Sequence, residues 1–206
     1  MTADYTAPPM DHDHDHEHDH EPVAETDEEL QAEAEREARR RFALAQIRQY
    51  GDPALRLTAY EVSDFDEDLK RLVDRMTDLM HDAQGVGLAA TQVGVLRRLF
   101  VFEPDENGPR TVVNPTIVKI GDELESDGEG CLSLQGVRVP VERATTVTIA
   151  GKDENGADVS YELSGYEARI AQHELDHLDG VLIIDRTDDE HRKEALATLR
   201  PRVTLR

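Results

Sequence analysis

Two histidines four positions apart, with an acidic residue directly after the first, form the pattern in this sequence that is best able to do chemistry: His173-Glu174-Leu175-Asp176-His177. On a helix, positions i and i+4 lie on the same face, so both imidazoles can bind one ion. Glu174 follows the first histidine directly, where its carboxylate can act as a general base on water. The pattern therefore predicts a divalent metal site carried by a helix.

Two histidines leave such a site incomplete, because a catalytic metal site uses three protein ligands and keeps one position open. The residues after His177 lack the His-x-x-Gly-x-x-His spacing of metzincins, which leaves Glu190 and Glu194 as the ligands that other zinc proteases would use. Cys131, in the segment Glu129–Ser133 (EGCLS), is the better candidate, because a thiolate beside a divalent cation is a strong ligand. The alternative for a lone cysteine is a small buried apolar residue.

A third segment, residues 85–94 (GVGLAATQVG), combines closely spaced glycines with an amide side chain. The glycines permit close approach of a ligand to the backbone, and the amide of Gln92 can stabilise an oxyanion. The alternative is a glycine-rich turn between a helix and a strand. The spacing is not a dinucleotide fingerprint, because no strand precedes it and the third glycine is misplaced.

Taken together, three segments resemble the peptide deformylase family, in the same order and with similar separations: Gly85–Gln92 (GVGLAATQ), Glu129–Ser133 (EGCLS) and Gln172–Gly180 (QHELDHLDG). The resemblance covers about residues 47–184. It implies an enzyme that removes the formyl group from the N-terminal formylmethionine of newly made polypeptides and releases formate. It also implies an α+β fold, with antiparallel β-sheets around a central metal-binding helix.

The resemblance assigns the metal ligands to Cys131, His173 and His177, and the general acid and base to Glu174. The family works with one divalent ion, usually Fe(II). Cysteine and histidine ligands also admit Zn, Ni or Co. A metal-dependent amide hydrolase is therefore expected.

The resemblance also implies residues that act on the substrate. Oxyanion stabilisation falls on the Gln92 side chain and the Leu132 backbone N–H, and a backbone contact to the peptide falls on Gly87. Arg138 and Arg143 match basic positions of the family. Ile170, one turn before the first histidine, is a candidate wall for the methionine side chain, with core packing as the alternative.

The elements that must hold these segments follow from hydrophobic periodicity and turn residues. A helix is predicted from Phe65 to His81, with Ser63 as its N-cap, because apolar residues recur at three- and four-residue spacing. Further helices are predicted at Tyr166–Leu178, ending at Gly180, and at Asp188–Leu199. Consecutive strands with short links favour antiparallel pairing. The predicted strands are Leu99–Phe102, Thr111–Val113, Thr116–Ile120, Thr145–Ile149 and Val159–Leu163.

The 206-residue chain fits one folded domain, predicted for residues 43–206, behind an acidic extension formed by residues 1–42. Residues 1–40 hold 14 acidic and 3 basic side chains, so this segment carries −11 of the net charge of −22. Residues 1–24 alternate acidic residues with histidine and are predicted to be disordered, with weak metal capture as the alternative. Residues 26–42 are predicted to form a helical arm, with Thr26 and Glu29 as a capping box.

The composition excludes several classes of function. The excess of negative charge disfavours binding to DNA, and no run of about 18 apolar residues is present, so no membrane span is expected. No secretory signal is visible and Cys131 has no partner for a disulfide, which favours the cytoplasm. Formylmethionyl nascent peptides and a transient contact with the ribosome are the partners that the resemblance implies.

Three other functions fit part of the pattern. A zinc endopeptidase would use the same two histidines but would cleave internal peptide bonds. A metal-buffering protein would depend on the histidine-rich residues 1–24. A catalytically inactive homologue would have lost part of the set Gln92, Cys131, His173, Glu174 and His177, and the sequence retains all of it.

Overall fold

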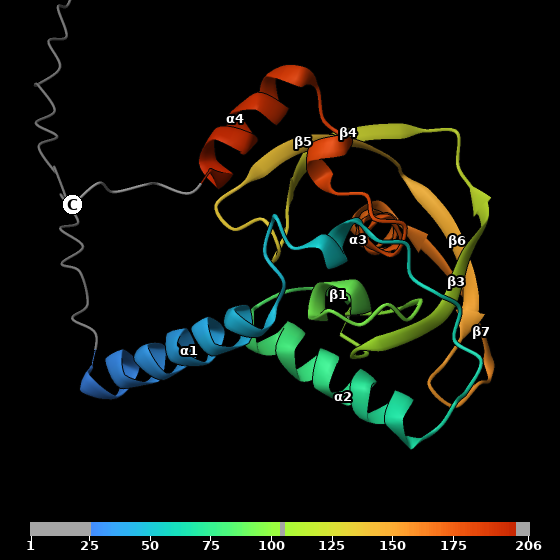
Figure 1. The fold of residues 1–206 in the computed structure, drawn as a ribbon, viewed down its shortest axis with the longest axis horizontal. Helices are drawn as coiled ribbons and strands as arrows, with labels where there is room; N and C mark the ends of the chain where they lie inside the picture. Colours follow the sequence, from blue (N-terminus) through green and yellow to red (C-terminus); the bar gives the residue numbers. More distant parts are fainter. Residues whose placement is uncertain (1–25, 104–105, 201–206) are drawn as a thin grey trace, which may run out of the picture.

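The computed structural model describes residues 26–103 and 106–200, so the predicted disordered tail, residues 1–24, lies outside the described residues. Four α-helices are present in the described part (Figure 1). They are α1 (Asp27–Gln46), α2 (Glu67–Asp82), α3 (Gly165–Leu178) and α4 (Asp189–Leu199). Short 3-10 helices occupy Pro53–Arg56, Ala90–Val93 and Ile183–Asp185. None of the described helices is both long and apolar enough to cross a membrane.

The strands form two sheets in which every ladder is antiparallel, as predicted. The five-stranded sheet has the order β1-β2-β3-β6-β7, and β4 and β5 form a separate two-stranded sheet. Figure 1 shows α3 end-on with the strands of both sheets around it, which confirms the predicted α+β class. The strands are β1 (Gly87–Ala89), β2 (Leu99–Phe102), β3 (Arg110–Ile120), β4 (Leu124–Gly130), β5 (Arg138–Ala144), β6 (Thr146–Lys152) and β7 (Asp158–Ser164).

Strand β2 separates two apolar cores. Because successive side chains of a strand point to opposite faces, Leu99 and Val101 pack into the core that includes α2, whereas Phe100 and Phe102 pack into the core around α3. All four residues are fully buried. The helix that carries the two histidines is therefore held against one face of the sheet, with α2 on the other face.

Helix α1 confirms the predicted arm and its capping box. The Thr26 hydroxyl accepts the Glu29 N–H at 3.3 Å, and the Glu29 carboxylate accepts the Thr26 N–H at 2.8 Å. The helix ends at Gln46 rather than at residue 42, because Ala43 and Leu44 are buried against the core that contains α2. The periodicity of the arm alone did not indicate this packing.

The predicted N-cap of α2 was wrong. Helix α2 begins at Glu67, and Asp66 is its N-cap, with a carboxylate that accepts the Leu69 N–H at 2.9 Å. Ser63 lies three residues earlier, and its hydroxyl donates to Asp64 instead. Both residue types are good caps, so the sequence did not decide between them.

The strands were predicted incompletely. Thr111–Val113 and Thr116–Ile120 belong to one strand, β3, which is interrupted by a register shift where Asn114 has φ of 51°. Strands β1, β4 and β5 were missed. The sequence of β4, LESDGEG, is polar and mostly exposed, so it has none of the apolar alternation by which a strand is predicted.

Candidate active site

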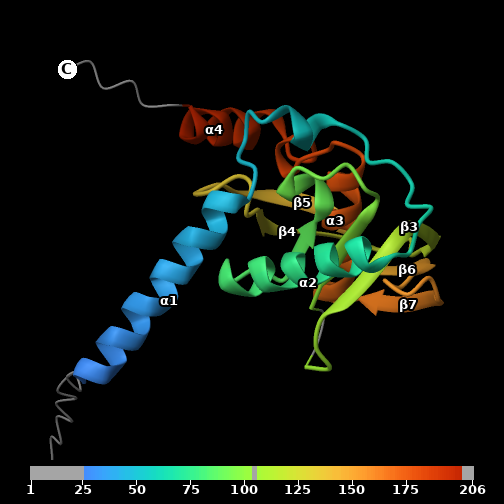
Figure 2. The same cartoon turned by 60° about the horizontal axis from the view of Figure 1, so that its bottom comes forward.

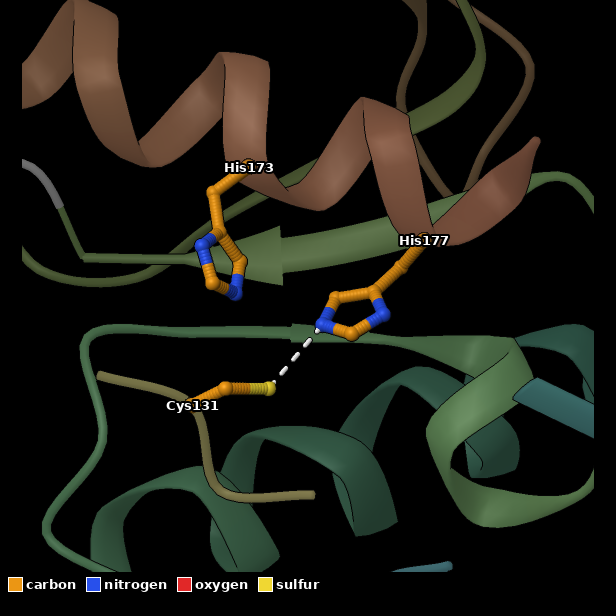
Figure 3. Close-up of side chains that lie close together, drawn as sticks. All are labelled: Cys131, His173 and His177. Carbon is orange, nitrogen blue, oxygen red and sulfur yellow. Dashed lines mark hydrogen bonds between the residues drawn. The ribbon is translucent and has the colours of Figure 1, made fainter. Parts of the chain in front are cut away.

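The three predicted metal ligands converge from two segments that are remote in the sequence. The Sγ atom of Cys131 and one ring nitrogen from each of His173 and His177 all lie within 4.8 Å of one another (Figure 3). The distance from Cys131 Sγ to His177 Nε2 is 3.2 Å. Within the described ranges this is the one group of three or more such side chains able to hold a metal ion, and Glu190 and Glu194 do not belong to it.

Cys131 is positioned by a tight turn that follows the end of β4. Its carbonyl accepts the Leu134 N–H at 3.0 Å, and the Ser133 N–H points at its sulfur at 3.4 Å. The side-chain amide of Gln92 lies 3.7 Å from the same sulfur. These contacts fix the sulfur beside the imidazole of His177, and the thiolate is the form of cysteine that binds metal.

Helix α3 presents both histidines on one face, as the spacing predicts. Ala171, Leu175 and Leu178 of the same helix pack into the core formed with the five-stranded sheet. The core therefore fixes the rotation of the helix about its axis, and this rotation turns His173 and His177 toward Cys131.

Glu129, two residues before the candidate cysteine ligand, organises the charges behind the site. Its buried carboxylate accepts hydrogen bonds from Arg143 at 3.0 Å, from Arg169 at 2.9 Å and from the ring of His173 at 3.0 Å. Burial raises the pKa of Glu129, but the hydrogen bonds from His173 and Arg143 outweigh this and lower the pKa to about 2. The bond to His173 uses Nδ1, so the ring orientation is fixed and Nε2 is left for a metal.

A second buried carboxylate, Asp176, joins this network from between the two histidines. It accepts a hydrogen bond from Arg143 at 2.5 Å and two from Arg186, at 2.5 Å and 3.0 Å. The sequence predicted no role for Glu129 or Asp176, and Arg143 was predicted only to match a basic position of the family. The position of Glu129 and Asp176 close to the candidate ligands could have indicated a supporting role for them. Their arginine partners could not be predicted in this way, because they lie on other elements.

Glu174 is placed as a general base requires. Its side chain is buried, and its Oε2 atom has no hydrogen-bond partner among the residues that the structure describes. Burial raises the pKa of Glu174 to about 7. Gly87 makes room for it, since a Cβ atom at that position would lie 2.9 Å from the Glu174 Cδ atom. A carboxylate in such a setting can exchange a proton near neutral pH.

Gln92 is held rigidly within reach of the thiol. Its Oε1 accepts the Ala89 N–H at 2.8 Å and its Nε2 donates to Ser133 Oγ at 3.1 Å, so the amide cannot rotate freely. The 3-10 helix Ala90–Val93 carries it immediately after β1. The segment is thus the predicted glycine-rich connection, and it also brings an amide donor to the site.

A cleft of about 480 Å³ opens over these residues. Apart from the buried His177, every residue predicted for the site lines it. These residues are Gly87, Gln92, Cys131, Leu132, Arg138, Ile170, His173 and Glu174. The cleft is also lined by Arg40 and Leu44 of α1, for which the sequence predicted no role.

The donor set fits a divalent transition metal. One thiol and two imidazoles are the ligand types that Fe(II), Zn, Ni and Co accept. Burial lowers the pKa of His177 well below its usual value, which keeps its ring neutral and able to bind a cation. Glu129 supplies the carboxylate partner that a metal-binding histidine usually has.

The chain is similar to peptide deformylases in sequence and in structure. The profile of the family described as Polypeptide deformylase matches residues 44–193. Peptide deformylase 1 of Corynebacterium glutamicum is 47% identical over 161 residues, which cover 77% of this chain and 95% of that protein. The crystal structure of peptide deformylase from Thermotoga maritima is 48% identical with a TM-score of 0.67, covering 69% of this chain and 96% of that one. Arabidopsis thaliana peptide deformylase 1B, in complex with an inhibitor, is 43% identical with a TM-score of 0.71, covering 75% and 87%.

Fold, site and similarity define a metal-dependent hydrolase. The chain belongs to the polypeptide deformylase family. It is an enzyme that removes the N-formyl group from newly made polypeptides, as the three sequence motifs predicted.

Proposed function

We propose that this chain carries out deformylation with Cys131, His173 and His177 as the ligands of a single divalent ion and Glu174 as the general acid and base. One observation carries the proposal: a thiol and two ring nitrogens lie within 4.8 Å of one another, beside a cleft that Cys131, His173 and the buried Glu174 line. Three protein ligands leave one position for water or substrate, which is the arrangement of catalytic rather than structural sites.

When bound, a divalent cation supplies Lewis acidity, which lowers the pKa of water and polarises a carbonyl group. Glu174 then has two tasks. It takes the proton from the attacking water, and it passes this proton to the nitrogen that leaves as the new amino terminus of the peptide. A pKa of about 7 suits both tasks, because a group that accepts and then donates a proton works best near the ambient pH.

The negative charge that develops on the formyl oxygen needs donors. We assign this role to the Gln92 amide and the Leu132 backbone N–H. Gln92 is supported by its fixed orientation toward Cys131 and Ser133. Leu132 is supported by its place next to the candidate ligand and in the lining of the cleft. Preorganised donors of this kind typically contribute about 3–4 kcal/mol each to stabilising the transition state.

The formylmethionyl peptide would lie along the cleft. We assign a backbone contact to Gly87, a wall of the methionine pocket to Ile170 and a peptide contact to Arg138. Ile170 is apolar, buried and part of the cleft lining, as a pocket for a thioether side chain requires. Arg138 is exposed at the cleft, and its guanidinium lies over Gly128.

Three further features belong to the proposal. Fe(II) is the expected ion, with Zn, Ni or Co as substitutes. Residues 43–206 are the hydrolase domain, which works in the cytoplasm in transient contact with the ribosome, with residues 1–42 as an extension. The net charge of −22 supports the prediction that DNA is not a partner. We also propose that the reaction does not involve a membrane.

Two substrates test the proposal. The protein loaded with Fe(II) is incubated with formyl-Met-Ala-Ser, with formate as the readout, and separately with casein, with fragments as the readout. We expect formate from the first and no fragments from the second. Fragments of casein without formate would instead indicate the endopeptidase alternative.

The variant Cys131→Ala should hold less than a full equivalent of metal by elemental analysis, because it lacks one of the three proposed ligands. A full equivalent would show that the third ligand lies elsewhere.

A further inference from the structure

We propose that Arg40, on the helix that precedes the family domain, is a specificity-determining residue of the substrate cleft and favours formylated peptides with an acidic side chain after the methionine. The inference rests on the proposed function of the cleft. It concerns a residue that lies before the part of the chain matched by the family profile, which begins at residue 44.

The C-terminal end of α1 is fixed to the catalytic segments. In both views, its last turns lie beside the C-terminal end of α2 (Figures 1 and 2). The Arg48 N–H donates to the Gln92 carbonyl at 2.7 Å, and the Tyr50 N–H donates to the Ser133 carbonyl at 2.9 Å. The Gln49 side chain donates to the Leu132 carbonyl at 3.1 Å. The residues that follow α1 are therefore tied to the same segments that supply the proposed oxyanion donors.

This anchoring directs one face of α1 at the cleft. Leu44 is buried in the core that includes α2, and Arg40 precedes it by four positions, which places both residues on the same helical face. Arg40 and Leu44 both line the cleft that contains Cys131, His173 and Glu174. The first half of α1 projects away from the body of the protein (Figure 2). Residues 27–39 are exposed, and Arg40 is the first residue of α1 that is partly buried.

The arginines that line the cleft differ in how their charge is used. Arg169 is buried and committed to Glu129 and to two backbone carbonyls. Among the residues that the structure describes, Arg40 forms an ion pair only with Glu37, at 3.9 Å. Both side chains of that pair are substantially exposed, so the pair holds the guanidinium weakly. Within the described part of the chain, Arg138 has no carboxylate within 4.0 Å.

The carboxylates of the cleft are less available than these cations. Glu129 is satisfied by its arginine and histidine partners, and Glu174 is reserved for proton transfer. Asp127 is the other acidic residue of the lining, and it accepts a hydrogen bond from the neighbouring Gly128 N–H. The outer cleft therefore offers two guanidinium groups against one exposed carboxylate, which favours an anionic group on the peptide.

The predicted contact lies away from the reacting atoms. It is made with the peptide equally before and during the chemical step, so it should change KM and leave kcat unaltered. An exposed charge pair of this kind supports an effect of about 2- to 5-fold. The effect should weaken as ionic strength rises.

The test compares formyl-Met-Ala-Ser with formyl-Met-Glu-Ser and formyl-Met-Ala-Glu, using the full chain loaded with metal. The variants are Arg40→Gln and Arg40→Glu, with Arg39→Gln as the matched control because Arg39 neighbours Arg40, is exposed and does not line the cleft. Glu37→Gln removes the weak partner of Arg40. Binding of the products Met-Glu-Ser and Met-Ala-Glu, measured by calorimetry, gives a readout that does not depend on turnover.

We expect Arg40→Gln to raise KM about 2- to 5-fold for at least one acidic peptide and to leave formyl-Met-Ala-Ser unchanged. Arg40→Glu should reverse the preference, Glu37→Gln should strengthen it, and Arg39→Gln should match the parent. The same order should appear in the affinity for Met-Glu-Ser or Met-Ala-Glu. Equal KM values for the parent and Arg40→Glu on both acidic peptides would overturn the inference while leaving deformylation intact. If the parent protein, loaded with metal, released no formate from formyl-Met-Ala-Ser, this result would instead contradict the proposed function.

Discussion

Two carboxylates close to the candidate ligands differ in their protonation because their partners differ. Glu129 faces two arginines and a histidine, so its pKa falls to about 2, whereas the pKa of buried Glu174 rises to about 7. The charged form of Glu129 can therefore orient His173, and Glu174 can exchange a proton near neutral pH, as the role proposed for it requires. A motif that contains Glu174 is visible in the sequence, but the difference between the two environments requires the fold.

Replacing Glu174 by alanine should separate chemistry from metal binding. The side chain is not among the three candidate ligands, so the metal content should stay at that of the parent. Loss of a general base typically costs about 10²- to 10⁴-fold in kcat. Formate release and elemental analysis of the same preparation check both halves of the prediction. Turnover within a few-fold of the parent would refute the role assigned to Glu174.

Replacing Glu129 by glutamine should weaken both the fold and the metal site. Arg143 and Arg169 would stay buried without their shared countercharge, which typically costs about 3–5 kcal/mol of unfolding free energy. His173 would lose a carboxylate partner, which typically lowers metal affinity about 10- to 100-fold. Urea unfolding and a competitive metal titration measure the two effects.

Glu125→Gln is the matched control, because Glu125 is an exposed residue of the same strand. It should lie within about 0.5 kcal/mol of the parent. If Glu129→Gln behaved like this control, the buried network would not position His173.

At the scale of elements, the helices were easier to predict from the sequence than the strands. The apolar spacing in α2 and the glycine after α3 are local signals, and both helices were located to within two residues. Strand β4 has a polar sequence and β1 is only three residues long, so their pairing depends on partners that are distant in the chain. Both strands adjoin the candidate site. The ligand types could be predicted because their motifs are local, whereas the residues that support them depend on this distant pairing.

The correction at the start of α2 can be measured. Asp66 accepts the Leu69 N–H, so Asp66→Ala should lower the unfolding free energy by about 1 kcal/mol, through loss of a cap and of a negative charge at the helix N-terminus. Ser63→Ala, at the position predicted from the sequence, should change it by less than about 0.5 kcal/mol. Urea unfolding of the two variants compares them directly. An equal loss from both variants would mean that Ser63 contributes to the cap.

At the scale of the whole molecule, charged side chains connect segments that are far apart in the chain. Arg56, after α1, pairs with Asp185, just before α4, and Arg192 of α4 also approaches Asp185. Arg98 and Asp179 link the start of β2 to the end of α3 at 2.6 Å. No local pattern indicates these pairs, because each partner belongs to an otherwise ordinary polar segment. They depend on the tertiary arrangement that the apolar cores establish first.

The pair of Arg56 and Asp185 should make stability depend on pH in acid. Burial raises the pKa of Asp185, but the hydrogen bonds from Arg56 and from the Leu182 N–H outweigh this and lower the pKa below its usual value. A group with a lowered folded pKa contributes stability above its unfolded pKa and loses the contribution as pH falls through the folded pKa.

Asp185→Asn should therefore lower the unfolding free energy by about 1 kcal/mol at pH 7, a value reduced because the pair is partly exposed. The cost should stay constant down to about pH 4 and shrink below it. Urea unfolding at several pH values measures the difference, with Asp74→Asn, on the exposed face of α2, as the control. A cost that persists undiminished at pH 3 would show that the Asp185 carboxylate contributes through its shape and not through its charge.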